Sequence, residues 1–116
     1  MSDVTISERQ RGDVTILDLD GKVTHKGGGA EQLRIIRVRL IGEKKKNILL
    51  NMENLEYIDS SGLGELVSGF TAAKKEGGVL KILALTQKVQ DVLAITKLLT
   101  VFDVYDDEGE ALSSYN

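Results

Sequence analysis

The stretch Tyr57-Ile58-Asp59-Ser60-Ser61-Gly62-Leu63-Gly64 is the most informative part of this chain. It follows a mostly apolar run, Asn47 to Met52, which predicts a strand buried on both faces. It precedes apolar residues spaced by three and four positions, which predict a helix over about 62–76. Two hydroxyls therefore fall at the start of a helix, between residues with little side-chain bulk. We expect a serine there to be exposed and to lie at the positive end of the helix dipole.

The sequence on either side of this stretch predicts an α/β domain. Two β-type runs joined by the turn signal Gly12-Asp13 predict a hairpin, whose second strand is expected to close at Asp20-Gly21. Gly77-Gly78 is a stop signal for the helix after the serines. Further helices are expected around 33–41, 89–96 and 108–112, and strands over 79–85 and 101–105. The prediction is one domain, residues 1–116, with a mixed four- to five-stranded sheet and helices packed on it.

Composition narrows the classes of function. A formal net charge of -3 argues against a nucleic-acid ligand, because such proteins usually present a strongly basic face. No apolar run approaches the roughly 20 residues that a membrane span needs, and the polar start of the chain is not that of a signal peptide. Cysteine is absent, which excludes disulfides and thiolate sites. We therefore expect a cytoplasmic protein without metal or cofactor.

The helix that starts at the serines has an unusual composition. Its positions off the apolar stripe include Ser61, Gly62, Gly64, Glu65 and Ser68. Each glycine inside a helix costs about 1 kcal/mol relative to alanine, so something must favour small residues. Close approach of a partner protein is the natural candidate. Capping of the helix by Ser60 or Ser61, worth about 1 kcal/mol, would account for only one of the serines.

A phosphoryl group on such a serine would act as a switch. It adds about 1.5–2 negative charges, which the N-terminus of a helix tolerates within the monomer. At an interface the same group would have to be desolvated against the partner. A hundredfold loss of affinity requires only about 2.7 kcal/mol, which one mismatched buried charge can supply. Ser61 is therefore a candidate site of phosphorylation.

The sequence resembles the STAS-domain family of bacterial anti-sigma factor antagonists over nearly its whole length. The resemblance rests on Asp59-Ser60-Ser61-Gly62-Leu63-Gly64, supported by Gly21, Gly77-Gly78 and the segment from Val89 to Phe102. It implies the STAS fold and a phosphoacceptor at the second serine, Ser61. It also implies a partner that is both an anti-sigma factor and a serine kinase of the histidine-kinase-like ATPase type. The unphosphorylated domain would bind this partner and release a sigma factor, and a metal-dependent serine phosphatase would reset the switch.

The predicted partner-binding residues come from two segments. The serine motif and its helix contribute Asp59, Ser60, Ser61, Gly62, Gly64, Glu65 and Ser68. The loop after the second strand, which in the family usually borders the partner, contributes Thr24 and His25. Many family members carry an acidic residue in this loop, where this chain has Thr24-His25-Lys26 followed by three glycines, Gly27 to Gly29. The free protein is expected to be a monomer.

Other interpretations of these residues are weaker. A hydrolase built from Ser61, His25 and Asp59 lacks the G-x-S-x-G turn that such enzymes use. The three glycines lack the Lys-Ser/Thr of a phosphate-binding loop. The acidic run from Asp103 to Glu108 is explained by charges at the start of a helix. The remaining alternative is a STAS module that acts as a scaffold or ligand sensor without phosphorylation.

Overall fold

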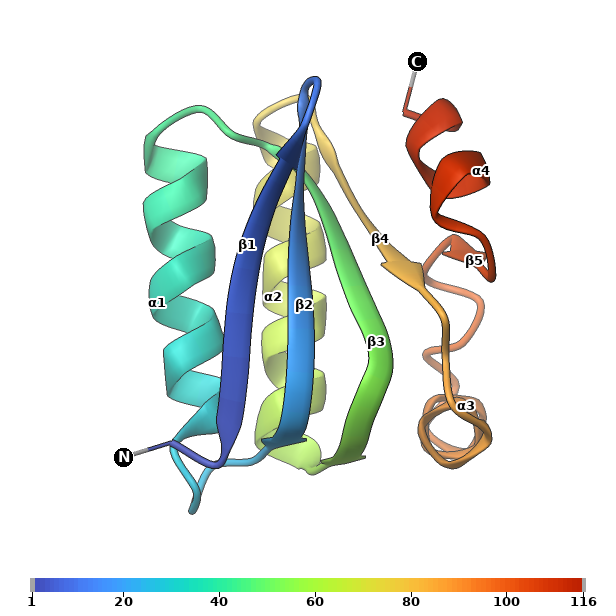
Figure 1. Cartoon of the computed structure of the whole chain (residues 1–116). Helices are drawn as coiled ribbons and strands as arrows, with labels where there is room; N and C mark the ends of the chain where they lie inside the picture. Colours follow the sequence, from blue (N-terminus) through green and yellow to red (C-terminus); the bar gives the residue numbers. More distant parts are fainter. Residues whose placement is uncertain (1, 116) are drawn as a thin grey trace.

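The computed structural model describes residues 2–115, and a five-stranded sheet forms its centre (Figure 1). The strands lie in the order in which they occur along the chain. The first pair is antiparallel, and every later pair is parallel. The mixed sheet and the hairpin turn at Gly12-Asp13 are therefore confirmed. The strands are β1 (Val4–Arg11), β2 (Val14–Val23), β3 (Asn47–Ile58), β4 (Val79–Leu83) and β5 (Val104–Tyr105).

Helices cover both faces of the sheet. Two of them, α1 (Gly29–Gly42) and α2 (Ser60–Lys75), lie side by side on one face (Figure 1). The short α4 (Glu108–Ser113) packs on the opposite face beside β4 and β5. The remaining helix, α3 (Gln87–Ile95), lies beside β3. Among residues 2–115, no helix is both long and apolar enough to cross a bilayer.

The core has a large and a small part, divided by the sheet. The large part lies between the sheet and the pair α1 and α2, where Leu17, Leu50 and Leu66 are almost completely buried. The small part lies under α4, where Ile16 and Leu49 contribute from the other face of the same strands. The prediction that the start of β3 is buried on both faces is thus confirmed.

The strands that lead to the serine motif are longer than predicted. The expected end of β2 at Asp20-Gly21 is wrong, because the strand passes through Gly21 at φ 118° and continues to Val23 with an irregular register. Likewise β3 continues to Ile58, which pairs with Val23. Parallel neighbours end at the same edge of a sheet. The loop after β2 and the start of α2 therefore meet at one end of the molecule.

The far end of α2 follows the predicted stop signal. The helix ends at Lys75, and Gly77 adopts the left-handed conformation at φ 84°. The main-chain N–H of Gly78 donates to Ala73 O at 2.9 Å, which satisfies a carbonyl of the last turn. A side chain at Gly78 would collide with the main chain of Lys46, so this glycine is also needed for close packing.

Candidate functional site

The turn between β3 and α2 is organised by the Asp59 carboxylate. Asp59 is the N-cap of α2, and its Oδ1 accepts a hydrogen bond of 2.9 Å from the main-chain N–H of Gly62. Its Oδ2 accepts a second bond of 2.9 Å from the main-chain N–H of His25, in the loop after β2. The alternative explanation, in which Ser60 or Ser61 caps the helix, does not hold. A carboxylate with two bonds replaces a hydroxyl and also joins the two segments.

These contacts lower the pKa of Asp59. Partial burial alone would raise it, but hydrogen bonds from the main-chain N–H groups of His25, Gly62 and Ser61 outweigh that effect. The positive charge that His25 can carry acts in the same direction. Asp59 is therefore held as an anion at the start of α2, where the helix dipole favours negative charge.

Ser60 and Ser61 lie in the first turn of α2 with their side chains exposed. Within residues 2–115, neither hydroxyl makes a hydrogen bond to another group of the protein. Because Asp59 caps the helix, both hydroxyls are free for other chemistry. Ser61 shares its side of the helix with Gly64 and Ser68, at positions i+3 and i+7, and both of these are also exposed.

The glycines of α2 are small for different reasons. A Cβ on Gly64 would meet nothing within 4 Å, so this glycine lies open to solvent. A Cβ on Gly62 would lie 2.5 Å from both Ile58 Cγ1 and Val23 O, so this glycine is required by packing inside the protein. The prediction that Gly62 belongs to the partner surface is therefore wrong. Its small size brings α2 against the ends of β2 and β3.

Glu65 was also predicted on the partner surface, and that prediction is wrong. Its side chain is buried between α1 and α2, and both of its oxygens bind the Arg37 guanidinium, at 2.8 and 3.0 Å. No local pattern marks this contact, because the two residues lie 28 positions apart in the sequence. The pair keeps an acidic charge away from the exposed face that carries Ser61.

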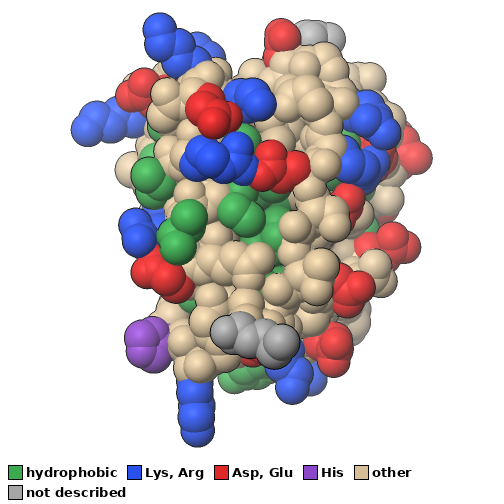
Figure 2. Space-filling view, turned by 60° about the vertical axis from the view of Figure 1, so that its left-hand side comes forward, with side chains coloured by type: hydrophobic (Ala, Val, Ile, Leu, Met, Phe, Trp, Pro, Cys, Tyr) green, Lys and Arg blue, Asp and Glu red, His purple; other side chains and the backbone are tan. Residues whose placement is uncertain are grey.

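The loop after β2, which carries Thr24 and His25, lies next to the serine motif. His25 is exposed, and the single histidine stands out in purple at the lower left of the surface in Figure 2. It contacts Asp59 through its main-chain N–H, so this contact gives no support to a Ser–His–Asp arrangement. The Thr24 hydroxyl donates to Asp3 Oδ2 at 3.0 Å, a partner that the sequence did not indicate.

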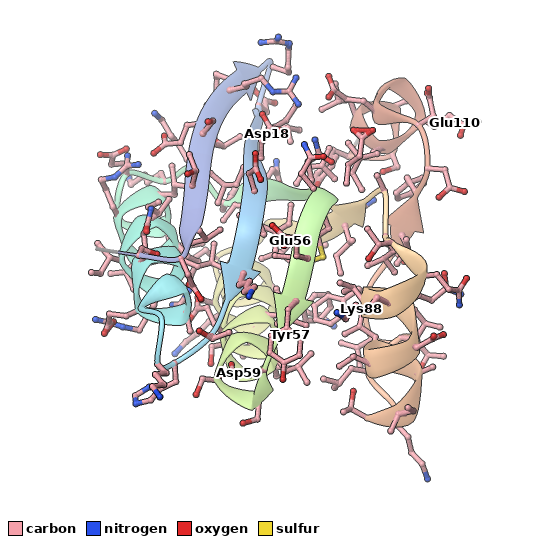
Figure 3. The ribbon with its side chains drawn as sticks, turned by 60° about the horizontal axis from the view of Figure 1, so that its bottom comes forward. Asp18, Glu56, Tyr57, Asp59, Lys88 and Glu110 are labelled. Atoms are coloured by element: carbon pink, nitrogen blue, oxygen red, sulfur yellow. The ribbon has the colours of Figure 1, made fainter. Side chains whose placement is uncertain are left out.

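One aromatic side chain borders this region. Tyr57, two residues before Asp59, is 42% exposed, and Lys88 Nζ of α3 lies 5.8 Å from the centre of its ring. Figure 3 shows Lys88 extending from α3 toward Tyr57, with Asp59 at the nearby start of α2. Cation–π contacts at exposed sites are worth about 0.5–1 kcal/mol. The sequence contains this tyrosine in its decisive stretch, but only the fold brings α3 beside it.

The acidic run near the C-terminus serves structural roles. Asp107 caps α4, and Glu108 binds Arg9 of β1 at 2.7 Å. Among the described residues, no group of three or more His, Asp or Glu side chains is arranged to hold a metal ion.

Comparisons with known proteins agree with this architecture. Residues 5–111 match the model of the STAS domain. The anti-sigma F factor antagonist of Paenibacillus polymyxa is 28% identical over 107 residues, which cover 91% of this chain and 89% of that protein.

Two solved structures show the same fold. An anti-sigma factor antagonist from Mycobacterium paratuberculosis superposes with a TM-score of 0.84 at 18% identity, covering 97% of this chain and 93% of that one. The Bacillus cell fate determinant SpoIIAA, solved in its phosphorylated form, superposes with a TM-score of 0.76 at 20% identity, covering 97% and 100%. The predicted STAS fold is confirmed.

Proposed function

The chain belongs to the STAS domain family, and from this premise we propose that it is an anti-sigma factor antagonist switched off by phosphorylation of Ser61. A relative that it matches over most of both chains carries the name anti-sigma F factor antagonist. In the unphosphorylated state the protein binds an anti-sigma factor in the cytoplasm, which releases a sigma factor. Its role in this exchange is binding rather than catalysis.

The observation that carries the proposal is the free hydroxyl of Ser61 on an open face. The side chain is exposed, and within residues 2–115 it bonds to no other protein group. Gly64 and Ser68, on the same side of α2, present no bulk that would hinder an approaching protein. A kinase can therefore reach the oxygen, and a partner can pack closely around it.

The local charges support a switch that acts on the interface and leaves the fold intact. A phosphoryl group on Ser61 would lie in the first turn of α2, where anions contribute about 0.3–1 kcal/mol of stability. The acidic Glu65, one turn further along, is neutralised by Arg37. Against a docked partner, however, the phosphoryl group must lose its water beside the anionic Asp59. Both steric bulk and unpaired charge then oppose binding.

The reaction that sets the switch is phosphoryl transfer by the partner. We propose an anti-sigma factor that is also a kinase of the histidine-kinase-like ATPase type. It transfers the γ-phosphoryl group of ATP to Ser61 Oγ, and ADP and the hydroxyl proton leave. A metal-dependent serine phosphatase hydrolyses the resulting ester to the free hydroxyl and inorganic phosphate. The antagonist is a monomer between these encounters.

The partner surface consists of two adjoining segments. The first is the exposed start of α2, and the second is the loop after β2, which Asp59 holds beside it through His25. Gly62 and Glu65 are left out because they are buried. The surface comprises Thr24, His25, Asp59, Ser60, Ser61, Gly64 and Ser68, with Tyr57 at its border.

Phosphopeptide mass spectrometry of the protein from its native host tests the assignment. Phosphate should be found on Ser61 and should disappear in Ser61→Ala, while the Ser60→Ala variant keeps it. Ser60 is the matched control because it is equally exposed in the same helical turn. Phosphate on Ser60 alone would move the assignment to that residue. A chain unmodified under every growth condition would instead favour the scaffold or ligand-sensing alternative.

A further inference from the structure

We propose that Asp3, just before β1, is a positioning residue that holds the loop of residues 24–28 against the start of α2. The inference builds on the proposed function, because this loop forms half of the proposed partner surface. Its evidence is separate, however, since it comes from contacts of Asp3 that involve neither serine. It also gives a role to the glycine-rich stretch, which the sequence alone does not explain.

Three glycines leave a space that Asp3 fills. Cβ atoms in proteins essentially never come within 3.0 Å of a heavy atom that is not close to them in the chain. A Cβ on Gly21 would break that limit against Asp3 O, and one on Gly27 would break it against the Asp3 carboxylate. A Cβ on Gly29 would lie 2.9 Å from Asp3 Oδ1 and 2.5 Å from Lys22 O. Main-chain atoms of Asp3 and Lys22 thus require Gly21 and Gly29, whereas a Cβ on Gly27 would displace the Asp3 carboxylate.

Hydrogen bonds fix Asp3 in this space. Its main-chain N–H donates to Gly27 O at 2.9 Å, and its carbonyl accepts from the main-chain N–H of Lys22 at 3.0 Å. Its Oδ2 accepts from the Thr24 hydroxyl, whose oxygen in turn accepts from the main-chain N–H of Gly27 at 2.9 Å. Asp3 therefore binds the loop at both of its ends.

The charge of Asp3 suits its position. The carboxylate lies close to Gly29, the first residue of α1. The N-cap of α1 is Gly28, which has no side chain to cap the helix. A negative charge near the start of a helix is stabilising, so the Asp3 carboxylate favours the start of α1 through its charge.

A continuous series of contacts joins Asp3 to the phosphorylation segment. Thr24, bonded to Asp3, is followed directly by His25, whose main-chain N–H binds Asp59. The other oxygen of Asp59 binds Gly62, the residue after Ser61. A loop released from Asp3 would lose its fixed place beside Ser61, and a partner would then have to order it on binding.

Amide hydrogen exchange measured by NMR tests this role without a partner. The loop is released either by Asp3→Ala, which removes the carboxylate, or by Gly27→Ala, which occupies its space. Both variants should speed exchange of the His25 amide by about tenfold or more, while the core amides of Leu17 and Leu50 keep their protection. The matched controls are Asp13→Ala, in the hairpin turn at the other end of β1, and Gly42→Ala, where a Cβ meets nothing within 4 Å.

Unchanged exchange at His25 in both variants would overturn the proposal. Faster exchange at the core amides as well would also overturn it, because Asp3 would then contribute to global stability only.

The consequence for binding is measured separately, by titration with the anti-sigma partner. Asp3→Ala should bind about tenfold more weakly than Asp13→Ala, and equal affinities would show that the loop does not need to be positioned. If the wild-type protein binds no anti-sigma factor, the proposed function fails, and the exchange experiment still decides the role of Asp3.

Discussion

Arg37 of α1 and Glu65 of α2 form a two-bond ion pair in which 14% of the arginine and 7% of the glutamate side chain are exposed. Leu33 and Leu66 line the same region, so the charges meet in largely apolar surroundings. The arginine stem also lies against Gly69, where a Cβ would be 3.6 Å from Arg37 Cγ. The pair joins α1 to α2 by two charged hydrogen bonds.

Removing one member of this pair should be costly. Arg37→Ala leaves the Glu65 carboxylate buried without a counter-charge, and we expect a loss of about 3 kcal/mol in the free energy of unfolding. Urea denaturation measures it. The matched control is Arg34→Ala, which breaks the pair with Glu31 on the same helix, where the side chains are 50% and 58% exposed. That change should cost far less, because an ion pair in water gains little from the attraction of its charges.

The double variant Arg37→Met with Glu65→Leu separates the cost of an unpaired charge from the value of the pair. Apolar side chains of similar volume leave nothing to desolvate, so its stability should lie close to that of the wild type. A loss equal to the sum of the two single losses would contradict this account, because the residues would then act independently.

Two glycines in the first turns of α2 should respond in opposite directions to the same substitution. Gly64→Ala adds a methyl group to open space in a helix, so it should stabilise the protein by about 1 kcal/mol. Gly62→Ala drives its Cβ into Ile58 and the Val23 carbonyl, and we expect a loss of about 2 kcal/mol. Thermal unfolding compares them directly. Destabilisation by both changes would mean that the surroundings of Gly64 are less open than its neighbours indicate.

Signals within single segments predicted most of the fold. The apolar spacing in α2 predicted the helix, and the glycines after it predicted where it ends. Both signals depend only on residues that are neighbours in the sequence. Gly21 led to a wrong prediction of the end of β2, because a glycine in a strand can mark either a turn or a bulge. Here the strand continues, and the main chain of Asp3 lies close against Gly21. Only this tertiary contact shows that the glycine does not mark a turn.

The site was predicted less completely for the same reason. The motif located the exposed serines and the neighbouring loop, but the apolar stripe of α2 does not show how deep the helix lies against the sheet. Gly62 was therefore assigned to the surface although it is buried. The partner of Glu65 lies on another helix, so no spacing within α2 could reveal it.

Asp59 should make stability depend on pH. Its pKa is lower in the folded than in the unfolded protein, so the native state favours the charged form. The resulting stabilisation is present above the unfolded value of about 3.9 and is lost as the pH falls through the lower folded value. In Asp59→Asn the side chain still caps the helix but cannot ionise. Urea unfolding from about pH 7 downward should therefore show the variant less stable at neutral pH and the difference shrinking in acid.

A second variant at this position separates charge from capping. Asp59→Ala can neither ionise nor cap, so it should remain about 1 kcal/mol less stable than Asp59→Asn across the whole pH series. Equal stability of the two variants would show that the side chain contributes through its charge alone. A difference between wild type and Asp59→Asn that does not change with pH would contradict the electrostatic explanation.

A charge at Ser61 should disrupt binding and spare the fold. Ser61→Asp is expected to weaken binding to the anti-sigma partner at least hundredfold, about 2.7 kcal/mol, while thermal unfolding stays nearly unchanged because anions suit the start of α2. Ser61→Ala should bind constitutively, which makes it the form with which to capture the partner. Ser60→Asp is the comparison: it places the same charge in the same turn, about 100° around the helix from Ser61. Calorimetric titration that found Ser60→Asp equally disruptive would mean that any negative charge at the start of α2 opposes the partner, and that the position of Ser61 is not special.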